Sequence, residues 1–200
     1  LPGFNDLASQ NPVLAAQWDT ERNGTLTPQQ VTLASNRKAW WICEKGHSFQ
    51  AVIASRANGT GCPYCTNKKV LAGFNDLATV EPRIAAEWHQ TLNGSLTPEM
   101  VTAGSRKKVW WECSLGHVWK AAIFPRTGAK KCGCPVCANR KILPGFNDFA
   151  TTHPALAAEW HPTKNGDLTP QKISYGYDKK VWWLCTNGHE WQAAPKTRVR

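Results

Sequence analysis

Residues 108–119 read Lys-Val-Trp-Trp-Glu-Cys-Ser-Leu-Gly-His-Val-Trp, and residues 134–137 read Cys-Pro-Val-Cys. The first stretch predicts two short β-strands joined by a tight turn, because aromatic and β-branched residues flank a glycine-containing turn. The spacings Cys-x3-His and Cys-x2-Cys each place two metal-binding side chains on a turn, where both can approach one ion. Together the two stretches predict a β-hairpin and a following cysteine loop that hold a metal ion between them.

The same pattern occurs three times, so the chain of 200 residues is a tandem repeat. Each copy of Trp-Trp-x-Cys and Gly-His is preceded by copies of Gly-Phe-Asn-Asp, Ala-Ala-x-Trp, Asn-Gly and Leu-Thr-Pro. The copies begin at Leu1, Leu71 and Leu143. We therefore predict three repeats with the boundaries 1–70, 71–142 and 143–200.

The first half of each repeat predicts short helices. In the first copy, Asn11-Pro12 is an N-cap followed by proline at the first helical position, and Thr27-Pro28 repeats this start signal. Asn23-Gly24 between them is typical of a turn. The predicted fold class is α+β, with short helices packed on a metal-bound β-hairpin in each repeat and little or no core shared between repeats.

Two repeats contain a complete set of metal ligands. Three thiolates and one imidazole match the closed tetrahedral shell of a structural zinc ion. We expect two such Zn²⁺ ions, each contributing on the order of 10 kcal/mol to folding. Repeat 3 has Cys185 and His189 without a second cysteine pair, so its site is predicted to be incomplete, and Cys132 is expected to be a bystander. The predicted ligands are Cys43, His47, Cys62 and Cys65 in repeat 1, and Cys113, His117, Cys134 and Cys137 in repeat 2.

Other uses of the cysteines fit less well. Disulfide bonds would require an oxidising compartment, and nothing in the sequence signals export. A thioredoxin-like Cys-x-x-Cys would need a βαβ context, and a catalytic zinc ion would need an open coordination position. No nucleophile–base set recurs, so we expect no enzymatic activity. We expect a cytoplasmic, nucleoid-associated or nucleus-associated protein that is not secreted, and no apolar run approaches the about 18 residues of a membrane span.

The repeat resembles a family of zinc-ribbon or treble-clef-like domains. The resemblance rests on Trp-Trp-x-Cys, Gly-His-x-Trp and Cys-Pro-x-Cys, with Glu87-Trp88 and Asn93-Gly94 upstream, and it covers two repeats and most of a third. It implies tandem arrays that bind nucleic acid, sometimes beside a nuclease-like domain, and it implies that the cysteines and histidines named above are zinc ligands. We expect the natural chain to continue past Arg200, where a nuclease domain or a partner would follow.

The charge of the chain favours a polyanionic partner. Its 24 Lys and Arg exceed its 14 Asp and Glu, which gives a net charge of +10. We expect double-stranded DNA rather than RNA, because a regular array of repeats matches a regular duplex. The alternatives are that surplus lysine only maintains solubility, that the array is a protein-interaction scaffold, or that it targets a larger nuclease.

Basic residues stand just before each Trp-Trp strand and predict phosphate contacts. Beside them, Asn36, Arg106 and Asp178 occupy one aligned position, and these types suit adenine, guanine and cytosine respectively in a major groove. Either this position reads bases, or it is an unconstrained loop. A recurrent arginine is predicted either to bind phosphate or to pair with an acid. The candidate nucleic-acid contacts are Asn36, Arg37, Lys38, Arg56, Arg106, Lys107, Lys108, Arg126, Asp178, Lys179, Lys180 and Arg198.

Overall fold

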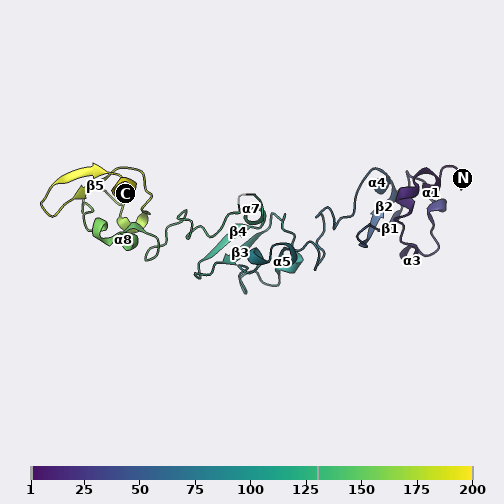
Figure 1. Cartoon of the computed structure of the whole chain (residues 1–200), viewed down its shortest axis with the longest axis horizontal. Coiled ribbons are helices and arrows are strands. Elements are labelled where there is room, and N and C mark those ends of the chain that lie inside the picture. The colour runs from purple at the N-terminus through teal and green to yellow at the C-terminus, as the bar shows by residue number, and fades with distance from the viewer. Residues whose placement is uncertain (1, 130, 200) are drawn as a thin grey trace. The chain divides into compact units, whose positions relative to one another are not determined.

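The computed structural model describes residues 2–129 and 131–199, and it consists of short helices and three separate two-stranded sheets (Figure 1). Its chain forms two compact units, which are Leu1–Ala86 with Gly94–Ser105, and Glu87–Asn93 with Arg106–Arg200. In the described residues no helix has the length and apolar character that crossing a membrane requires. The α+β class predicted from the sequence is confirmed, because each hairpin has short helices around it.

Repeat 1 begins with short helices, and the sequence predicts the N-cap of the second of them. Asn11 accepts a hydrogen bond from the Leu14 N–H at 3.0 Å, and Pro12 fills the first helical position, as predicted. The second predicted start, at Thr27-Pro28, gives a single 3₁₀ turn rather than an α-helix. A further helical turn precedes it and ends at Asn23. The elements are α1 (Leu7–Gln10), α2 (Pro12–Ala15), α3 (Thr20–Asn23), η1 (Pro28–Gln30), β1 (Lys38–Ile42), β2 (Ser48–Val52) and α4 (Ile53–Ala57).

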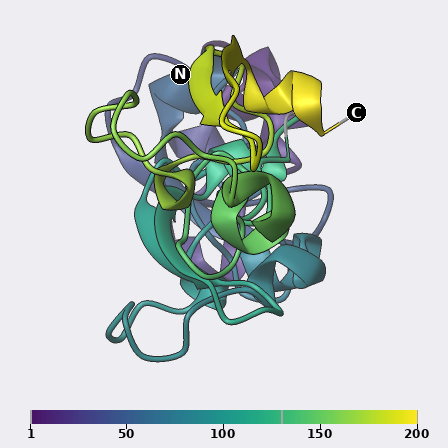
Figure 2. The ribbon, with the colours of Figure 1, turned by 90° about the vertical axis from the view of Figure 1, so that its left-hand side faces the viewer.

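The other two repeats have the same order of elements, with a turn in place of α3. In repeat 2 these are α5 (Leu77–Val80), α6 (Pro82–Ala85), η2 (Pro98–Met100), β3 (Lys108–Glu112), β4 (Val118–Ala122) and α7 (Phe124–Thr127). In repeat 3, drawn from green to yellow in Figure 2, they are α8 (Phe149–Thr152), α9 (Pro154–Ala157), η3 (Pro170–Lys172), β5 (Val181–Leu184), β6 (Glu190–Ala193) and α10 (Pro195–Arg198).

The three hairpins share one register. Trp41 is opposite Phe49 in β1–β2, and the equivalent pairs in the other hairpins are Trp111 with Trp119 and Trp183 with Trp191. A glycine in the left-handed region, such as Gly46 with φ 79°, closes each turn between the strands. The register places the residue after β1 and the residue before β2 beside each other, which is where the first ligand pair stands.

Tryptophans form the core of each repeat. The second tryptophan of each Trp-Trp pair is fully buried, and in repeat 1 Trp41 meets the edge of Trp18 at a ring-centroid distance of 5.1 Å. Successive strand residues face opposite sides, so the first tryptophan of the pair is only half-buried. One tryptophan of each pair therefore packs onto the helical half of its repeat. Repeats 1 and 3 each have their own cluster of buried side chains.

The Asn-Gly motif does more than make a turn. Asn23 accepts a hydrogen bond from the Trp40 N–H and donates one to the Trp40 C=O, both at 2.8 Å. Asn93 binds Trp110 and Asn165 binds Trp182 in the same way. The asparagine side chain therefore pairs with the outer edge of the first strand of each hairpin.

Candidate metal centres and the basic loops

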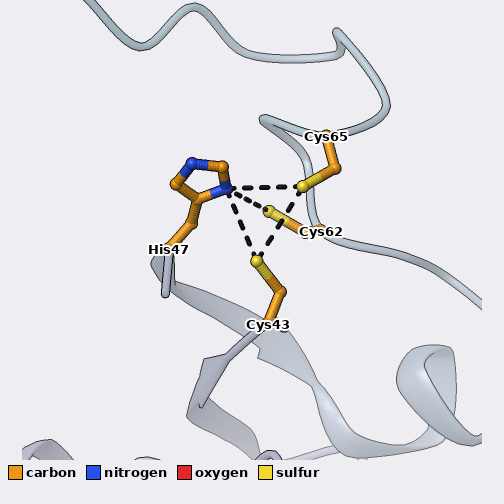
Figure 3. A group of neighbouring side chains, drawn as sticks. All are labelled: Cys43, His47, Cys62 and Cys65. Carbon is orange, nitrogen blue, oxygen red and sulfur yellow. Dashed lines mark hydrogen bonds between the residues drawn. The ribbon is translucent and has the colours of Figure 1, made fainter. Parts of the chain in front are cut away.

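Repeat 1 brings its four predicted ligands to one point (Figure 3). Cys43 follows β1 and His47 precedes β2, while Cys62 and Cys65 come from the loop after α4. The Nδ1 atom of His47 lies 3.4 Å from the sulfurs of Cys43 and Cys65 and 3.8 Å from the sulfur of Cys62. The sulfurs of Cys43 and Cys65 are 3.8 Å apart.

These distances fit the ligand shell of a zinc ion. Zn–S bonds of about 2.3 Å and Zn–N bonds of about 2.05 Å at tetrahedral angles separate two sulfurs by about 3.8 Å, and a sulfur from a nitrogen by about 3.6 Å. The sulfur–sulfur separation in repeat 1 is also far from the about 2.05 Å of a disulfide bond. The geometry therefore matches four ligands around one ion, with all positions filled by protein atoms.

Repeat 2 has the same arrangement. His117 Nδ1 lies 3.4, 3.7 and 3.3 Å from the sulfurs of Cys113, Cys134 and Cys137, and Cys113 and Cys137 are 3.8 Å apart. Cys132 belongs to neither ligand group in the described residues, although it stands two residues before Cys134. The metal ligands predicted from the sequence are thus brought together in both complete repeats.

A family model described as "Probable Treble clef zinc finger domain" matches residues 14–68, 84–140 and 156–200. The chain belongs to this treble clef family. Each match spans one of the three hairpins, and the resemblance noted from the sequence is confirmed. No curated protein has significant similarity to the chain.

We call each complete set of four ligands a cage, and the thiols within a cage differ in acidity. The cages are Cys43, His47, Cys62 and Cys65 in repeat 1, and Cys113, His117, Cys134 and Cys137 in repeat 2. Burial raises the pKa of Cys43, but hydrogen bonds from the backbone N–H groups of His47 and Lys45 outweigh it, so the pKa lies below the ordinary value. Burial, with hydrogen bonds to Cys43 and Cys62, raises the pKa of Cys65 to about 11. In repeat 2 the same causes raise the pKa of Cys137 to about 12. Zinc would supply the positive charge that lets three neighbouring thiolates form together, and its binding would release protons.

Repeat 3 has a half-site. Cys185 Sγ lies 3.6 Å from His189 Nδ1, close to the separation in the complete cages. Among the described residues, no other cysteine joins this pair, and His189 is exposed. The site is incomplete as the sequence predicts.

The recurrent arginine is buried in repeats 1 and 2 and partly buried in repeat 3, which favours its other predicted role, pairing within the fold, over binding nucleic acid. Arg126 is 4% exposed, and its guanidinium lies 4.2 Å from the ring centroid of Trp111 and 5.1 Å from that of Trp119. One of its nitrogens is 2.6 Å from a Glu87 carboxylate oxygen. A group held between two rings and an acid cannot reach a phosphate.

The equivalent arginines have the same role in their own repeats. Arg198 pairs with Glu159 at 2.6 Å, and its guanidinium lies 4.4 Å from the Trp183 ring centroid. In repeat 1 the partner is neutral, since Arg56 donates hydrogen bonds to the Gln17 side chain and the Thr60 C=O. The contacts within the fold thus argue against nucleic-acid binding by Arg56, Arg126 and Arg198. Of the two roles predicted for this position, the pairing role is the one present in repeats 2 and 3.

The remaining candidate contacts are at the surface, at the start of the first strand of each hairpin. The loop of repeat 1 is fixed by its backbone, because the Ser35 and Arg37 C=O groups accept hydrogen bonds from the N–H groups of Ala54 and Ile53. The exposed side chains are Asn36, Arg37 and Lys38, Arg106, Lys107 and Lys108, and Asp178, Lys179 and Lys180. Their contact with nucleic acid stays a prediction.

The half-buried tryptophans have cations over their rings. The Arg22 guanidinium lies 4.6 Å from the Trp40 ring centroid, and Lys164 Nζ lies 4.7 Å from that of Trp182. In repeat 2, Lys120 Nζ is 5.6 Å from the Trp110 ring. Stacking of a base on these rings would have to displace the cation, so the basic loops are the better-presented surface.

Proposed function

We propose that this chain binds nucleic acid, preferably double-stranded DNA, through the basic loops that precede the first strand of each hairpin. The observation that carries the proposal is the recurrence of an exposed basic pair at one backbone-anchored position in all three treble clef repeats. The net charge of +10 supports it. The backbone hydrogen bonds that fix each loop would limit the entropy lost when the loop meets phosphate.

The affinity would come from phosphate contacts. Lysine and arginine that neutralise phosphates release counterions, so binding weakens steeply as salt rises. Each loop offers two or three exposed cations. Because the loops belong to one polypeptide chain, binding of one loop raises the effective concentration of the others at the duplex and increases the overall affinity.

The selectivity would come from the residue beside each basic pair. Asn36, Arg106 and Asp178 are all exposed, and their side chains can match adenine, guanine and cytosine in a major groove. This reading is supported by residue chemistry and by exposure at an aligned position. Selection of bound duplexes from a random pool, with zinc present, tests it. A recovered consensus supports selectivity, and a pool that stays random contradicts it.

We further propose that the chain has no catalytic activity and works in a reducing compartment, as in the cytoplasm or beside the nucleoid or nucleus. The closed ligand shells leave no position on zinc for water. Incubation of plasmid DNA with the zinc-loaded protein and Mg²⁺ should leave the plasmid supercoiled. Nicking that persists through purification and disappears in a charge-reversed loop variant would contradict this.

The loops themselves can be tested by removing two charges. Arg106→Ala with Lys107→Ala should weaken duplex binding and lower the slope of log affinity against log salt by about 2, since about one counterion is released per phosphate contact. The matched control, Arg83→Ala with Lys172→Ala, removes two exposed charges from the helical halves. Titrations by fluorescence anisotropy at several salt concentrations measure both. Equal losses in the two variants would show that only net charge matters.

A protein-interaction scaffold is the second candidate. A hollow of about 440 Å³ beside α7 is lined by Phe124, Pro125, Gly128 and Ala129, and Phe124 is 54% exposed. A scaffold predicts weak duplex binding that shows no consensus and disappears at moderate salt. The same selection experiment therefore separates the two candidates. A role in targeting a nuclease would give a consensus sequence, as the DNA-binding proposal does.

A further inference from the structure

The Gly-Phe-Asn-Asp motif has two separate tasks in the structure. Its aspartate begins the helices of its own repeat. Asp76 accepts a hydrogen bond from the Thr79 N–H at 2.9 Å, and Asp148 accepts one from the Thr151 N–H at 3.0 Å. The phenylalanine and asparagine just before it contact the metal cage of the preceding repeat instead.

The phenylalanine covers the histidine ligand. The ring of Phe74 lies edge-on to that of His47 with centroids 4.2 Å apart, and Phe146 lies against His117 at 4.3 Å. Lys45 Nζ lies 5.3 Å from the centroid of the Phe74 ring. Because packing fixes the imidazole plane, the contact helps to direct Nδ1 toward the three sulfurs.

The asparagine holds the cysteine loop closed. Asn75 is 5% exposed, and its side-chain nitrogen donates to the C=O of Tyr64, which lies between the two cysteines, at 2.8 Å. It also donates to the C=O of Lys69 at 2.9 Å and to the Asn67 side chain at 3.1 Å, while its oxygen accepts from the Leu71 N–H at 2.7 Å. A single buried amide thus joins both ends of the loop that carries Cys62 and Cys65.

The second junction repeats this set of contacts. Asn147, also 5% exposed, donates to the Val136 C=O at 2.8 Å and the Lys141 C=O at 2.9 Å. Asn139 and Leu143 complete the arrangement at 3.2 Å and 2.7 Å. Two junctions with the same partners show a recurring design rather than one incidental contact.

We propose that this motif is a junction that couples the metal cage of one repeat to the helical half of the next. Its Phe and Asn stabilise the cage. Its Asp, which is the next residue after that Asn, caps the following helix. Loading a cage with metal should therefore also stabilise the next repeat. The coupling is a nearest-neighbour interaction of the kind that makes repeat arrays cooperative, and it does not depend on what the array binds.

The first copy of the motif retains the capping task. Asp6 caps α1 through the Ser9 N–H at 2.9 Å, as its counterparts do. Phe4, however, is 72% exposed and Asn5 is also exposed, whereas Asn75 and Asn147 are buried. Since the two cages contact the second and third copies, substitutions in the first copy serve as matched controls.

Hydrogen exchange of the full, zinc-loaded chain tests the junction. Asn75→Ala should speed exchange about tenfold in the loop of residues 62–69 and in α5, because it removes several buried hydrogen bonds. Repeat 3 should keep its exchange rates, which also shows that the variant is folded. Asn147→Ala should move the effect to residues 134–141 and α8. The control Asn5→Ala should change neither cage. Equal rates in α5 for Asn75→Ala and the unchanged chain would overturn the proposal.

A second variant tests the direction from cage to helix. Cys62→Ser with Cys65→Ser removes the first cage without touching the motif. The amides of α5 should then exchange faster, while those of α8, which follow the intact second cage, should not. A rise in both helices, or in neither, would refute nearest-neighbour coupling. Release of zinc to a chelator gives an independent readout, since Phe74→Ala should speed release from one site only and Phe4→Ala from none.

Discussion

Repeats 2 and 3 have the same hairpin, the same tryptophan pair and the same arginine–glutamate pair, but only repeat 2 has a complete cage. The side chains beneath the cage differ accordingly. Trp119 is 8% exposed while Trp191 is half-buried, and Arg126 is 4% exposed while Arg198 is 18% exposed. The cysteine loop therefore covers one side of the hairpin. The strands of repeat 3 pair in the same register without this loop.

Removing the second ligand pair of repeat 2 should have the largest effect. Cys134→Ser with Cys137→Ser leaves the half-site that repeat 3 has, and a structural zinc ion contributes on the order of 10 kcal/mol. We expect the metal content to fall from two ions to one per chain, and protection of the β3–β4 amides to fall to the level of β5–β6 or below. Elemental analysis and hydrogen exchange measure these.

Cys132→Ser is the control for this double variant, since Cys132 lies outside the ligand group. It should retain two metal ions and the protection of the wild-type hairpin. Loss of metal from the control, or two ions retained by the double variant, would contradict the assignment of the ligands.

The buried arginines should rank by their burial. Arg126→Ala should destabilise its repeat by about 1.5–3 kcal/mol, because it removes a buried guanidinium that packs on Trp111 and Trp119 and bonds to Glu87. Arg198→Ala should cost less, since 18% of the Arg198 side chain is exposed against 4% of Arg126. Hydrogen exchange resolved by repeat measures both values. Glu87→Gln is a milder control, as Gln17 holds this position in repeat 1. Equal costs for the two alanine variants would show that the cage does not shield the pair.

The smallest effect concerns the helix cap of repeat 3. Burial raises the pKa of Asp148, but hydrogen bonds from the Thr151 hydroxyl and N–H and from the Gly145 N–H outweigh it and lower the pKa below 3.8. A lowered folded pKa stabilises the native state above the unfolded value, and this contribution is lost as pH falls through the folded pKa. Acid should therefore weaken α8 only below about pH 4.

Asp148→Asn separates the charge from the cap, because asparagine caps helices about as well as aspartate. Exchange in α8 should lose its acid dependence in this variant and change little near neutral pH. Since zinc ligands take up protons on acidification, measurements on Cys134→Ser with Cys137→Ser remove the neighbouring cage as a second source of pH dependence. An acid dependence that survives in the asparagine variant would assign it to another group.

The sequence was sufficient for the parts of the fold that depend on near neighbours. Cys43 and His47 are four residues apart on one turn, and Trp40-Trp41 belong to an aromatic strand beside it, so local spacing predicted the hairpin and its ligands. Two copies in the same register showed which cysteines belong together and left Cys132 out. Proline at the first helical position likewise located the helix starts.

The parts that the sequence left open or missed depend on distant partners. Arg126 and Glu87 are 39 residues apart, and an exposed arginine has the same local sequence as a buried one. Asn23 reaches Trp40 across 17 residues, where only turn chemistry was visible locally. Asn75 binds the cysteine loop of the preceding repeat, whereas the adjacent Asp76 caps a helix of the following one. The available signal in the sequence was that Phe and Asn recur before each Asp, although capping a helix needs only the Asp.

The asparagine that binds the outer strand has a consequence for how such arrays coexist in the cell. A two-stranded sheet has two open edges, and several such sheets in one chain could join edge to edge into larger aggregates. Asn23, Asn93 and Asn165 occupy the N–H and C=O groups through which a foreign strand would attach. The asparagine thereby blocks one of the two edges of each hairpin, so that near-identical hairpins cannot pair through their first strands at this position.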